Sequence, residues 1–428
     1  MSALSGLKDG RLKDASLLRQ GPLALALSAL NGEGQETRVV GGAVRDLALG
    51  LRPSDFDLAT TAAPAETMRR AMAAGFKVAP TGLAHGTVSL IMDGRAIETT
   101  TLREDVETDG RHAKVAFGLD FFADARRRDF TINALSLAAD GRIFDPVGGL
   151  DDLVAGRVRF IGDADERIRE DYLRILRFFR FSARFAAGAL DQDGLDAAVR
   201  RRAELGRLSR ERVRVEVLKL LVAPRAGEVA RIMGERGILG ELLGFADPGR
   251  LERAVAIEAD AGMEPDPLLR LAALCLLIRD DAERLVERLR LSNAEGDRLA
   301  GAGSALARLH GLSAAPSAEA LRRVLFEFGR RSASDALALA EAEIRIGPGD
   351  AGFADARRFL GEAPEPQSPV GGKDVVALGV APGPRVGDIL RAFHRLWDEA
   401  GHPMDAPTVD RLLRTAAELI SPQAVRRQ

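Results

Sequence analysis

The sequence predicts a fold that mixes strands and helices up to about residue 150 and is helical almost throughout beyond residue 160. Before residue 150, short apolar runs alternate with Gly and Asp turns, as in TRVVGGAVRD and GTVSLIMDG, which is typical of strands. After residue 160, apolar residues recur every three or four positions, as in RERVRVEVLKLLVA, which is typical of amphipathic helices. With 428 residues, the chain is long enough for several domains with sizeable cores.

The boundaries of several elements are visible in the sequence. Asp140-Gly141 predicts a tight turn between two strands near the end of the mixed part. Asp163 or Asp165 is a suitable N-cap for the first helix of the helical part. A segment rich in Pro and Gly, 361–374, separates a final helical stretch from the rest. We therefore expect the helical part to be divided into two or three pieces.

Composition places the chain among ordinary globular proteins, with 46% hydrophobic and 29% charged residues. The net charge of −2 means that any nucleic-acid binding must rest on local basic patches. A single cysteine, Cys275, excludes an internal disulfide and a Cys-based zinc site. The N-terminus lacks an apolar segment of signal-peptide length, and no apolar run reaches the roughly 20 residues of a membrane span. We expect a cytoplasmic protein with no membrane partner.

The stretch SDFDL (54–58) places two carboxylates one residue apart. On a strand, Asp55 and Asp57 would point to the same face, with Phe56 turned into the core. Their repulsion would be removed by divalent cations, and Mg²⁺ binds one or two carboxylates together with substrate phosphates. The alternative is a solvated turn after Pro53, because D-x-D alone is a weak signal.

A second signal, VVGGAVRD (39–46), lies just upstream. Gly41 and Gly42 have no Cβ, so backbone N–H groups can approach a ligand closely. We expect a helix to follow, with Arg45 in its first turn, where the guanidinium could pair with a phosphate. The alternative is a tight strand-to-helix turn with Arg45 as a surface charge. A phosphate site a dozen residues before a metal-binding Asp pair is chemically coherent.

These stretches together resemble a known family. GGAVRD followed by SDFDLATT resembles the head signature of class II tRNA nucleotidyltransferases, the CCA-adding enzymes, and of the related bacterial poly(A) polymerases. Further stretches that match in family order are HGTVSL (85–90), IETTTLREDVETDGRHAKVAF (97–117), RRDFTINAL (127–135), DPVGGLDDLVAGRVRFIG (145–162) and EDYLRILRFFRF (170–181). The resemblance runs from about residue 38 to about residue 185.

The resemblance implies a fold and a domain order. The fold would be an α+β head of the polymerase-β nucleotidyltransferase type, with a small, mostly antiparallel sheet, followed by an all-α neck, body and tail. The expected boundaries are an N-terminal extension 1–33, the head 34–150, the neck 151–225 with the nucleotide-selecting helix, the body 226–345 and a tRNA-binding tail 346–428.

The resemblance also implies a catalytic set. Asp55 and Asp57 would bind Mg²⁺, and Glu98 would be a third catalytic carboxylate; the alternative for Glu98 is a surface residue at a strand end. Gly42, Arg45 and Arg128 would contact the incoming nucleotide. An RNA 3′-hydroxyl would attack the α-phosphate of a nucleoside triphosphate with loss of pyrophosphate, and positioning and charge neutralisation would supply most of the rate.

Base selection is expected from one helix of the neck. Asp171 and Arg174, three apart on a helix, would be neighbours on its surface. A carboxylate accepts hydrogen bonds and a guanidinium donates them, which complements cytosine and adenine and mismatches uracil and guanine. The alternative is a surface salt bridge. Arg177 continues the row and would bind nucleotide, and Arg180 matches the family pattern although it lies about half a turn away from Asp171.

Three further segments are expected to serve RNA or nucleotide. The loop 103–117 resembles one that helps the change from C to A addition. The basic stretch 200–219 is either an RNA surface or a solvated helix face. The tail stretch 371–390 could bind phosphates of the tRNA. Arg126 and Arg127 form either a basic strip for RNA or a solvated face.

The function expected from these observations is addition of C, C and A to the 3′ end of tRNA from CTP and ATP, by a monomer or weak homodimer. The alternatives are a poly(A) polymerase and a catalytically inactive RNA-binding protein. The chain lacks the basic C-terminal block that poly(A) polymerases usually carry, and the candidate acids and arginines are intact. None of the five histidines is followed by Asp, so no added phosphohydrolase activity is expected.

Overall fold

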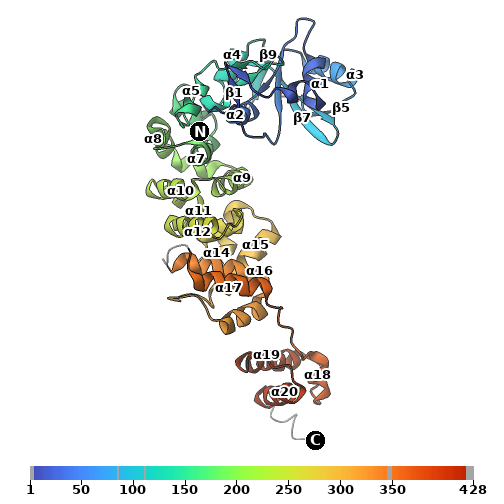
Figure 1. Cartoon of the computed structure of the whole chain (residues 1–428), viewed down its shortest axis with the longest axis vertical. Coiled ribbons are helices and arrows are strands. Elements are labelled where there is room, and N and C mark those ends of the chain that lie inside the picture. The colour runs from blue at the N-terminus through green and yellow to red at the C-terminus, as the bar shows by residue number, and fades with distance from the viewer. Residues whose placement is uncertain (1–3, 84–85, 110–111, 345–348, 421–428) are drawn as a thin grey trace. The chain divides into compact units, whose positions relative to one another are not determined.

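The computed structural model describes residues 4–83, 86–109, 112–344 and 349–420. The chain forms two compact units, Met1–Leu242 and Leu243–Gln428. Figure 1 shows the strands gathered in the first unit, whereas the second consists of helices. The predicted fold class, a small-sheet head followed by a helical remainder, is therefore confirmed. Among the described residues, no helix combines the length and the apolar character that crossing a membrane requires.

A seven-stranded sheet lies at the centre of the first unit, in the order β11-β10-β3-β4-β7-β6-β5. Its strands are β3 (Thr37–Val40), β4 (Asp57–Thr60), β5 (Lys77–Gly82), β6 (Thr87–Met92), β7 (Arg95–Thr101), β10 (Ser136–Leu137) and β11 (Ile143–Phe144). All neighbours are antiparallel except β4 and β7, which run parallel. The predicted turn at Asp140-Gly141 joins β10 to β11, with Gly141 at φ 86°.

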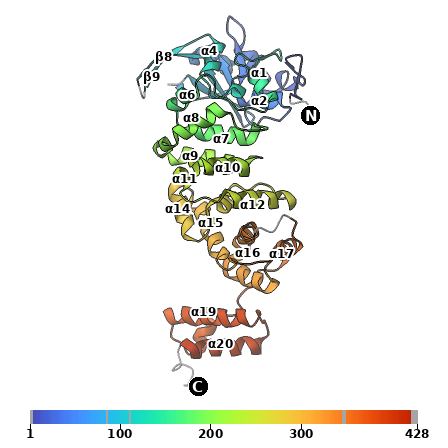
Figure 2. The same ribbon diagram turned by 90° about the vertical axis from the view of Figure 1, so that its left-hand side faces the viewer.

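Both faces of the sheet are covered close to its centre. On one face lie α1 (Gly21–Leu30) and α3 (Pro64–Ala73), which contact β3, β5 and β6. On the other face, Phe121 of α4 (Phe121–Arg126) packs over Val40, Ala59 and Leu102. Two two-stranded ribbons complete the head, β1 (Leu7–Lys8) with β2 (Arg11–Leu12) and β8 (Arg103–Asp109) with β9 (His112–Phe117). Figure 2 shows the β8–β9 ribbon extending away from the sheet.

One further helix, α2 (Gly42–Ala48), lies inside the head, between β3 and β4. The helices that follow the head are α5 (Gly149–Val154), α6 (Ala164–Glu170), α7 (Leu173–Phe185), α8 (Gln192–Arg200), α9 (Arg210–Leu221), α10 (Ala226–Glu235) and α11 (Ile238–Leu243). An aromatic cluster holds α7 against the end of the head: the ring centres of Phe130 and Phe160 are 4.7 Å apart, and those of Phe160 and Phe178 are 5.7 Å apart. The first unit therefore joins the sheet and α7 through one core.

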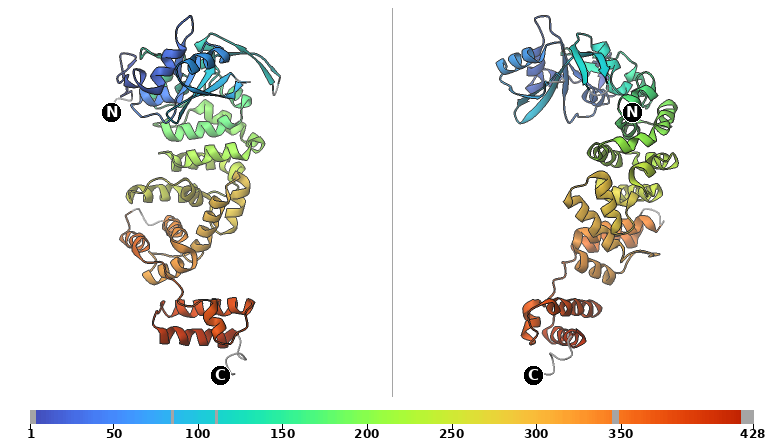
Figure 3. Two further views of the ribbon diagram at one scale, coloured as in Figure 1. Left: turned by 90° about the vertical axis from the view of Figure 1, so that its right-hand side faces the viewer. Right: turned by 180° about the vertical axis from the view of Figure 1, so that it is seen from behind.

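The second unit contains nine described helices. They are α12 (Pro248–Asp260), α13 (Pro267–Cys275), α14 (Asp280–Leu289), α15 (Asn293–Leu306), α16 (Ala318–Glu343), α17 (Ala351–Glu362), α18 (Gly372–Ala377), α19 (Pro384–Glu399) and α20 (Ala406–Ile420). Within it, α19 and α20 lie side by side (Figure 3) around a core that includes Phe393 and Trp397. The predicted break, 361–374, contains the connection between α17 and α18, and the helical stretch expected after it forms α18, α19 and α20.

One buried carboxylate fixes the exit from the head. Asp152 of α5 is fully buried and accepts hydrogen bonds from Thr131 Oγ1 at 2.6 Å, Arg157 Nε at 2.7 Å and Arg159 Nε at 3.0 Å. Both arginines are about half exposed, with side-chain exposures of 50% and 44%. The Asp152 carboxylate therefore depends on its partners to compensate its charge, whereas water can solvate the two arginines.

This asymmetry predicts unequal costs of substitution. Removing both arginines, Arg157→Ala/Arg159→Ala, should lower the free energy of unfolding by about 3–5 kcal/mol, because a buried charge is left uncompensated. Asp152→Asn should cost less, about 1–3 kcal/mol, because the freed arginines can be solvated. Circular dichroism during urea unfolding measures both, and fluorescence of Trp397, the single tryptophan and part of the second unit, is the internal control. A larger cost for Asp152→Asn would contradict the argument.

Candidate functional site

The candidate catalytic carboxylates meet at one edge of the parallel strand pair. Asp57 is the first residue of β4 and pairs directly with Glu98 of β7. Paired residues on adjacent strands point to the same face, so the two carboxylates stand side by side. Asp55 does not lie on the strand as expected, because β4 begins at Asp57; it belongs to the preceding segment, where Ser54 Oγ donates to its Oδ2 at 2.9 Å. Phe56 is half-buried rather than a core residue.

The charges of this cluster are not balanced. The Asp57 carboxylate is open to solvent on one side, yet partial burial raises its pKa above the ordinary value. The negative charge of Glu98 raises the pKa further and Asp55 adds to it, while Arg128 opposes them. Among the described residues, no three acidic, His or Cys side chains already stand close enough together to hold a metal ion. The donor set of carboxylate oxygens with excess negative charge fits a hard divalent cation.

Two glycines and an arginine border the carboxylates. Gly41 precedes α2 at φ 74°, where a side chain is strained, and a Cβ there would lie 3.1 Å from an Arg128 nitrogen. A Cβ on Gly42, the first residue of α2, would lie 3.3 Å from an Arg45 nitrogen. Arg128 itself is held by Asp124 Oδ2 at 2.9 Å, and its charge acts on Asp57. The structure thus brings Gly42 and Arg128 to the edge that carries Asp57.

Arg45 is placed differently from the expectation. Its side chain is buried, with Nη1 donating to Asn133 Oδ1 at 2.6 Å and Nη2 to Asp46 Oδ1 at 2.7 Å. The guanidinium carbon lies 4.1 Å from the centre of the Phe185 ring. Arg45 is therefore neither an open surface charge nor a free phosphate ligand, because internal partners already hold it, and burial lowers its pKa.

The carboxylate of Asp129 connects the head to α7. Its Oδ1 accepts from Asn133 Nδ2 at 3.1 Å and its Oδ2 from Arg177 Nε at 2.7 Å. Burial alone would raise the pKa of Asp129, but the charge of Arg177 and these hydrogen bonds outweigh it and lower the pKa. On the other side, Glu216 of α9 pairs with Arg180 Nε at 2.8 Å and with Arg177 at 3.7 Å. Arg177 and Arg180 thus share one buried network.

The sequence argument did not single out Asp129, Asn133 or Glu216. A signal existed for each. Asp129 and Asn133 are four apart inside RRDFTINAL, where they follow two arginines. Glu216 interrupts the apolar spacing of Val213, Val217 and Leu220 on α9, which marks a buried carboxylate in need of partners.

The helix expected to carry base selection is interrupted. Asp171 is extended at φ −154° and ψ 107°, between the end of α6 and the start of α7. Its Oδ1 accepts from the Leu173 backbone N–H at 3.1 Å, a local bond that favours a turn over a helix interior. Its Oδ2 pairs with Arg212 of α9 at 2.6 Å. Arg174 pairs instead with Glu170 and donates to the Arg167 carbonyl at 2.7 Å. The alternative reading, a salt bridge between the Asp171 and Arg174 side chains, is not found among the described ion pairs, although the Arg174 backbone N–H donates to the Asp171 carbonyl at 2.9 Å.

The other expected segments are partly engaged within the first unit. The stretch 103–117 forms the β8–β9 ribbon, whose tip at 110–111 lies outside the described residues. In the basic stretch 200–219, Arg201 pairs with Asp165 at 2.7 Å and Arg212 with Asp171. Part of its positive charge is thus neutralised by acids of the same unit.

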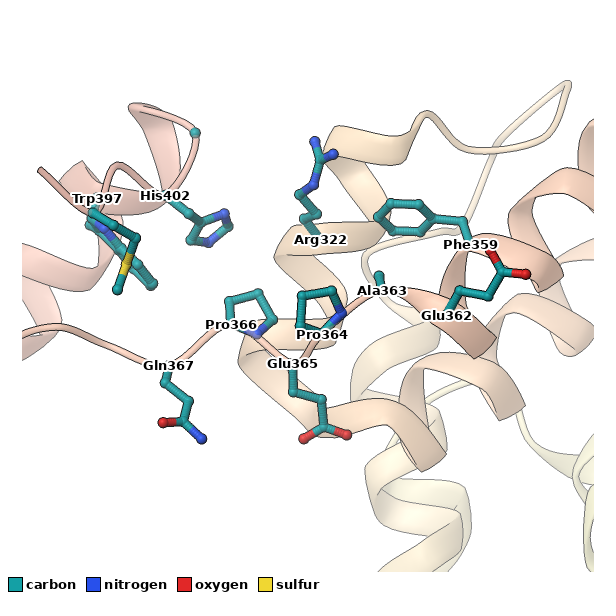
Figure 4. Close-up of a pocket in the computed structure, with 12 residues that line it drawn as sticks. Arg322, Phe359, Glu362, Ala363, Pro364, Glu365, Pro366, Gln367, Trp397 and His402 are labelled. Atoms are coloured by element: carbon teal, nitrogen blue, oxygen red, sulfur yellow. The ribbon is translucent and has the colours of Figure 1, made fainter.

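A cavity of about 630 Å³ lies in the second unit. Figure 4 shows its lining, which includes Trp397 and His402, the segment 363–367, and Arg322 with Phe359. Burial has the largest influence on the His402 imidazole, and it lowers the pKa of that group. The cavity lacks the paired carboxylates of the sheet edge, so the acidic cluster of the first unit is the candidate site for phosphoryl chemistry.

Comparisons with known proteins relate the chain to one family. Residues 37–159 match the family model described as "Poly A polymerase head domain". The chain is 34% identical over 377 residues to the mitochondrial CCA tRNA nucleotidyltransferase 1 of Mus musculus, covering 87% of this chain and 85% of that protein. It is 40% identical over 230 residues to the CCA-adding enzyme of Geobacillus thermodenitrificans, covering 53% and 56%. The crystal structure of the Bacillus stearothermophilus CCA-adding enzyme in complex with CTP matches with a TM-score of 0.72 at 29% identity, covering 92% of this chain and 96% of that one.

The comparisons correct one expectation from the sequence. A cytoplasmic location was expected from the absence of a targeting signal, and it is wrong on this evidence. Three relatives of which the chain covers 85–87%, from Mus musculus, Danio rerio and Homo sapiens, are mitochondrial enzymes.

The raised pKa of Asp57 generates a stability prediction. A carboxyl whose pKa is higher in the folded state than in the unfolded state loses stability as pH rises through that pKa. In the absence of divalent cations, Asp57→Asn should therefore melt at a temperature equal to or about 1–3 °C above that of the unsubstituted protein at pH 8, and the difference should vanish near pH 4. Differential scanning calorimetry in EDTA at both pH values measures it. The electrostatic argument would be overturned if Asp57→Asn melted below the unsubstituted protein at pH 8 and the two proteins melted together at pH 4.

Proposed function

The chain belongs to the family of CCA tRNA nucleotidyltransferases, and we propose that it adds C, C and A to the 3′ end of tRNA, using CTP and ATP. The observation that carries the assignment is the coverage of 87% of this chain and 85% of a CCA tRNA nucleotidyltransferase at 34% identity. The paired carboxylates Asp57 and Glu98 supply the chemistry that this reaction needs. The enzyme is a nucleotidyltransferase, and it works without a nucleic-acid template.

The proposal assigns catalysis to the acidic edge of the sheet. Asp55 and Asp57 would hold the divalent cation, which we propose is Mg²⁺, and Glu98 would be the third catalytic carboxylate. A divalent cation bound there would activate the attacking hydroxyl and stabilise the leaving oxygen. The excess negative charge that raises the pKa of Asp57 supports this role, because it is the charge such an ion would compensate.

The surrounding arginines would bind and orient the nucleotide. Arg128 is the first candidate for the phosphates, because its guanidinium lies against Gly41 and its charge acts on Asp57. Arg45, Arg177 and Arg180 each have internal partners, but a guanidinium carries five N–H groups and can hold a ligand in addition. Gly42 is the first residue of α2, and it leaves the N-terminus of that helix free of a side chain. Their fixed positions would reduce the cost of orienting the triphosphate.

Base selection is proposed for Asp171 and Arg174. The carboxylate would accept from the amino group of cytosine or adenine, and the guanidinium would donate to the neighbouring ring nitrogen. Both side chains already have partners, Arg212 for Asp171 and Glu170 for Arg174. Nucleotide binding would therefore exchange these ion pairs for contacts to the base.

The remaining parts of the proposal concern partners and organisation. The partner is the 3′ end of tRNA, and the assembly is a monomer or weak homodimer. A solved Thermotoga maritima CCA-adding enzyme complexed with tRNA shares the fold of this chain with a TM-score of 0.66. The proposed boundaries remain an extension 1–33, head 34–150, neck 151–225, body 226–345 and tail 346–428.

The activity is tested by extension of a tRNA transcript that lacks its CCA end, resolved at single nucleotides. With Mg²⁺, CTP alone should add two residues, and CTP with ATP should add three and then stop. Asp55→Ala/Asp57→Ala should reduce extension by at least about 10³-fold, because the charge stabilisation of the transition state is lost. A long ladder with ATP alone would identify a poly(A) polymerase, and tRNA binding without extension an inactive RNA-binding protein.

Base selection is tested separately by Asp171→Asn. The amide keeps the size of the side chain but can donate as well as accept, so the preference for C and A over U should narrow. We expect kcat/KM for CTP and ATP to fall by about 10–100-fold, the loss of one hydrogen bond to a charged group. Single-turnover incorporation of each of the four nucleotides measures this, with Glu170→Gln as the matched control for loss of a nearby carboxylate. Unchanged selectivity in Asp171→Asn would exclude a role for Asp171 in base selection.

A further inference from the structure

A second hollow lies on the face of the sheet that carries the carboxylates. Phe144, Ser136, Val40, Asp57 and Glu98 form one row across five strands, each paired directly with the next. Because directly paired residues point to the same face, the first two share a face with the two acids. Phe144 and Ser136 line a cavity of about 440 Å³. With strands about 4.8 Å apart, this cavity lies about 10–15 Å from Asp57.

The floor of this cavity, which we call the Arg38 hollow, is a rigid stack. The guanidinium carbon of Arg38 lies 3.8 Å from the ring centre of Phe144 and 4.1 Å from that of Phe121. Arg38 Nε donates to Glu36 Oε1 at 2.7 Å, and the Arg38 side chain is only 13% exposed. A planar cation fixed between two rings gives the cavity a floor of defined shape. The volume of the cavity is in the range of small-molecule sites.

The rim of the Arg38 hollow is both apolar and cationic. Leu119 and Phe122 line it and are unusually exposed, at 73% and 47%. The guanidinium of Arg126, an exposed residue, lies 5.2 Å from the centre of the Phe122 ring. An exposed aromatic ring beside an exposed arginine is the combination by which proteins bind single-stranded nucleic acid, with the ring stacking on a base and the cation contacting its phosphate.

The acids of the hollow define what can enter it. Glu36, Asp120 and Asp145 outnumber the single cation of the floor, so a free triphosphate would be repelled. Asp120 accepts from the Phe122 backbone N–H at 2.7 Å, and Asp145 from that of Gly149 at 2.8 Å. Asp145 also accepts from the Leu150 backbone N–H at 2.8 Å, so both of its oxygens are engaged. Asp120 is held through one oxygen, which leaves the other to accept from the exocyclic amino group of cytosine or adenine.

We propose that the Arg38 hollow binds a nucleobase of the RNA primer close to its reacting 3′ end, with the base stacked on Phe122 and an adjoining phosphate on Arg126. The inference rests on the proposed function, since it supplies the reacting RNA strand with a site on the same face as Asp57 and Glu98. It makes Phe122 and Arg126 binding residues for RNA and leaves the incoming nucleotide to the other arginines.

The test compares four variants of the full chain: Phe122→Ala, Phe122→Trp, Arg126→Ala and, as control, Met72→Ala. Met72 is a similarly exposed apolar residue of α3, on the opposite face of the sheet. For each variant, KM is measured for a tRNA transcript lacking CCA and for CTP. The Kd of the same fluorescently labelled transcript is measured across salt concentrations.

Phe122→Ala should raise KM and Kd for the transcript by about 10–100-fold, the loss of one stacked base, and Phe122→Trp should restore most of the loss. Arg126→Ala should lower the slope of log Kd against log salt by about one. Met72→Ala should change neither. Equal values for Phe122→Ala and Met72→Ala, with extension by the unsubstituted protein intact, would overturn this inference alone.

Two other outcomes are separable. A rise in KM for CTP without a rise for the transcript would place a free nucleotide in the hollow and overturn the inference. Failure of the unsubstituted protein to extend any transcript would overturn the proposed function, while the Kd series, which needs no turnover, would still decide whether RNA uses the hollow.

Discussion

The buried carboxylate of Asp129 is the interaction on which the first unit depends. It accepts hydrogen bonds from Asn133, at the end of the head, and from Arg177 of α7, so one buried charge connects the head to the helical part. Asn133 in turn accepts from Arg45, which extends the same network back to α2 at the edge of the sheet. Because a buried carboxylate is costly unless it is fully paired, these groups have one arrangement that satisfies all of them. The residues proposed to bind nucleotide are thereby held in fixed positions relative to the acidic edge.

At the acidic edge, in contrast, the negative charges are not balanced by internal partners. Asp57 and Glu98 face each other across parallel strands, and partial burial together with the charge of Glu98 raises the pKa of Asp57 although Arg128 opposes them. The network around Asp129 is neutralised internally, whereas this pair is left with negative charge to be neutralised from outside. This unbalanced charge lowers stability at the edge, and it is the charge that the proposed cation would compensate. The same contrast separates structural from functional charges elsewhere in the unit, as with the fully paired Asp152.

Much of this organisation was predictable from the sequence, and the failures have physical causes. The division into a small-sheet head and helices follows from periodicity, and Asp57 lies on a strand as expected, but Asp55 precedes that strand and its expected place on it was wrong. The break at Asp171 was not predicted, because a 3.6-residue pattern continues through it while a local hydrogen bond to Leu173 decides the backbone. The burial of Arg45 was not predicted either. Its partner Asn133 is distant in sequence, and such a contact leaves no periodic trace. Glu98 could be placed near Asp57 only by resemblance, since register between strands is not written in either strand alone.

The parallel pairing of β4 and β7 has a consequence for how the chain folds. Helix α3 and strands β5 and β6 lie between these two strands in sequence, and β4 and β7 meet only after that whole segment has been closed into a loop. Closure of this kind is an entropic cost that must be met before the pairing returns any free energy. We therefore expect the acidic edge to be assembled late, after the apolar contacts of the sheet have condensed. The chain must therefore reach the native state against the mutual repulsion of Asp57 and Glu98, which come together only when folding is nearly complete.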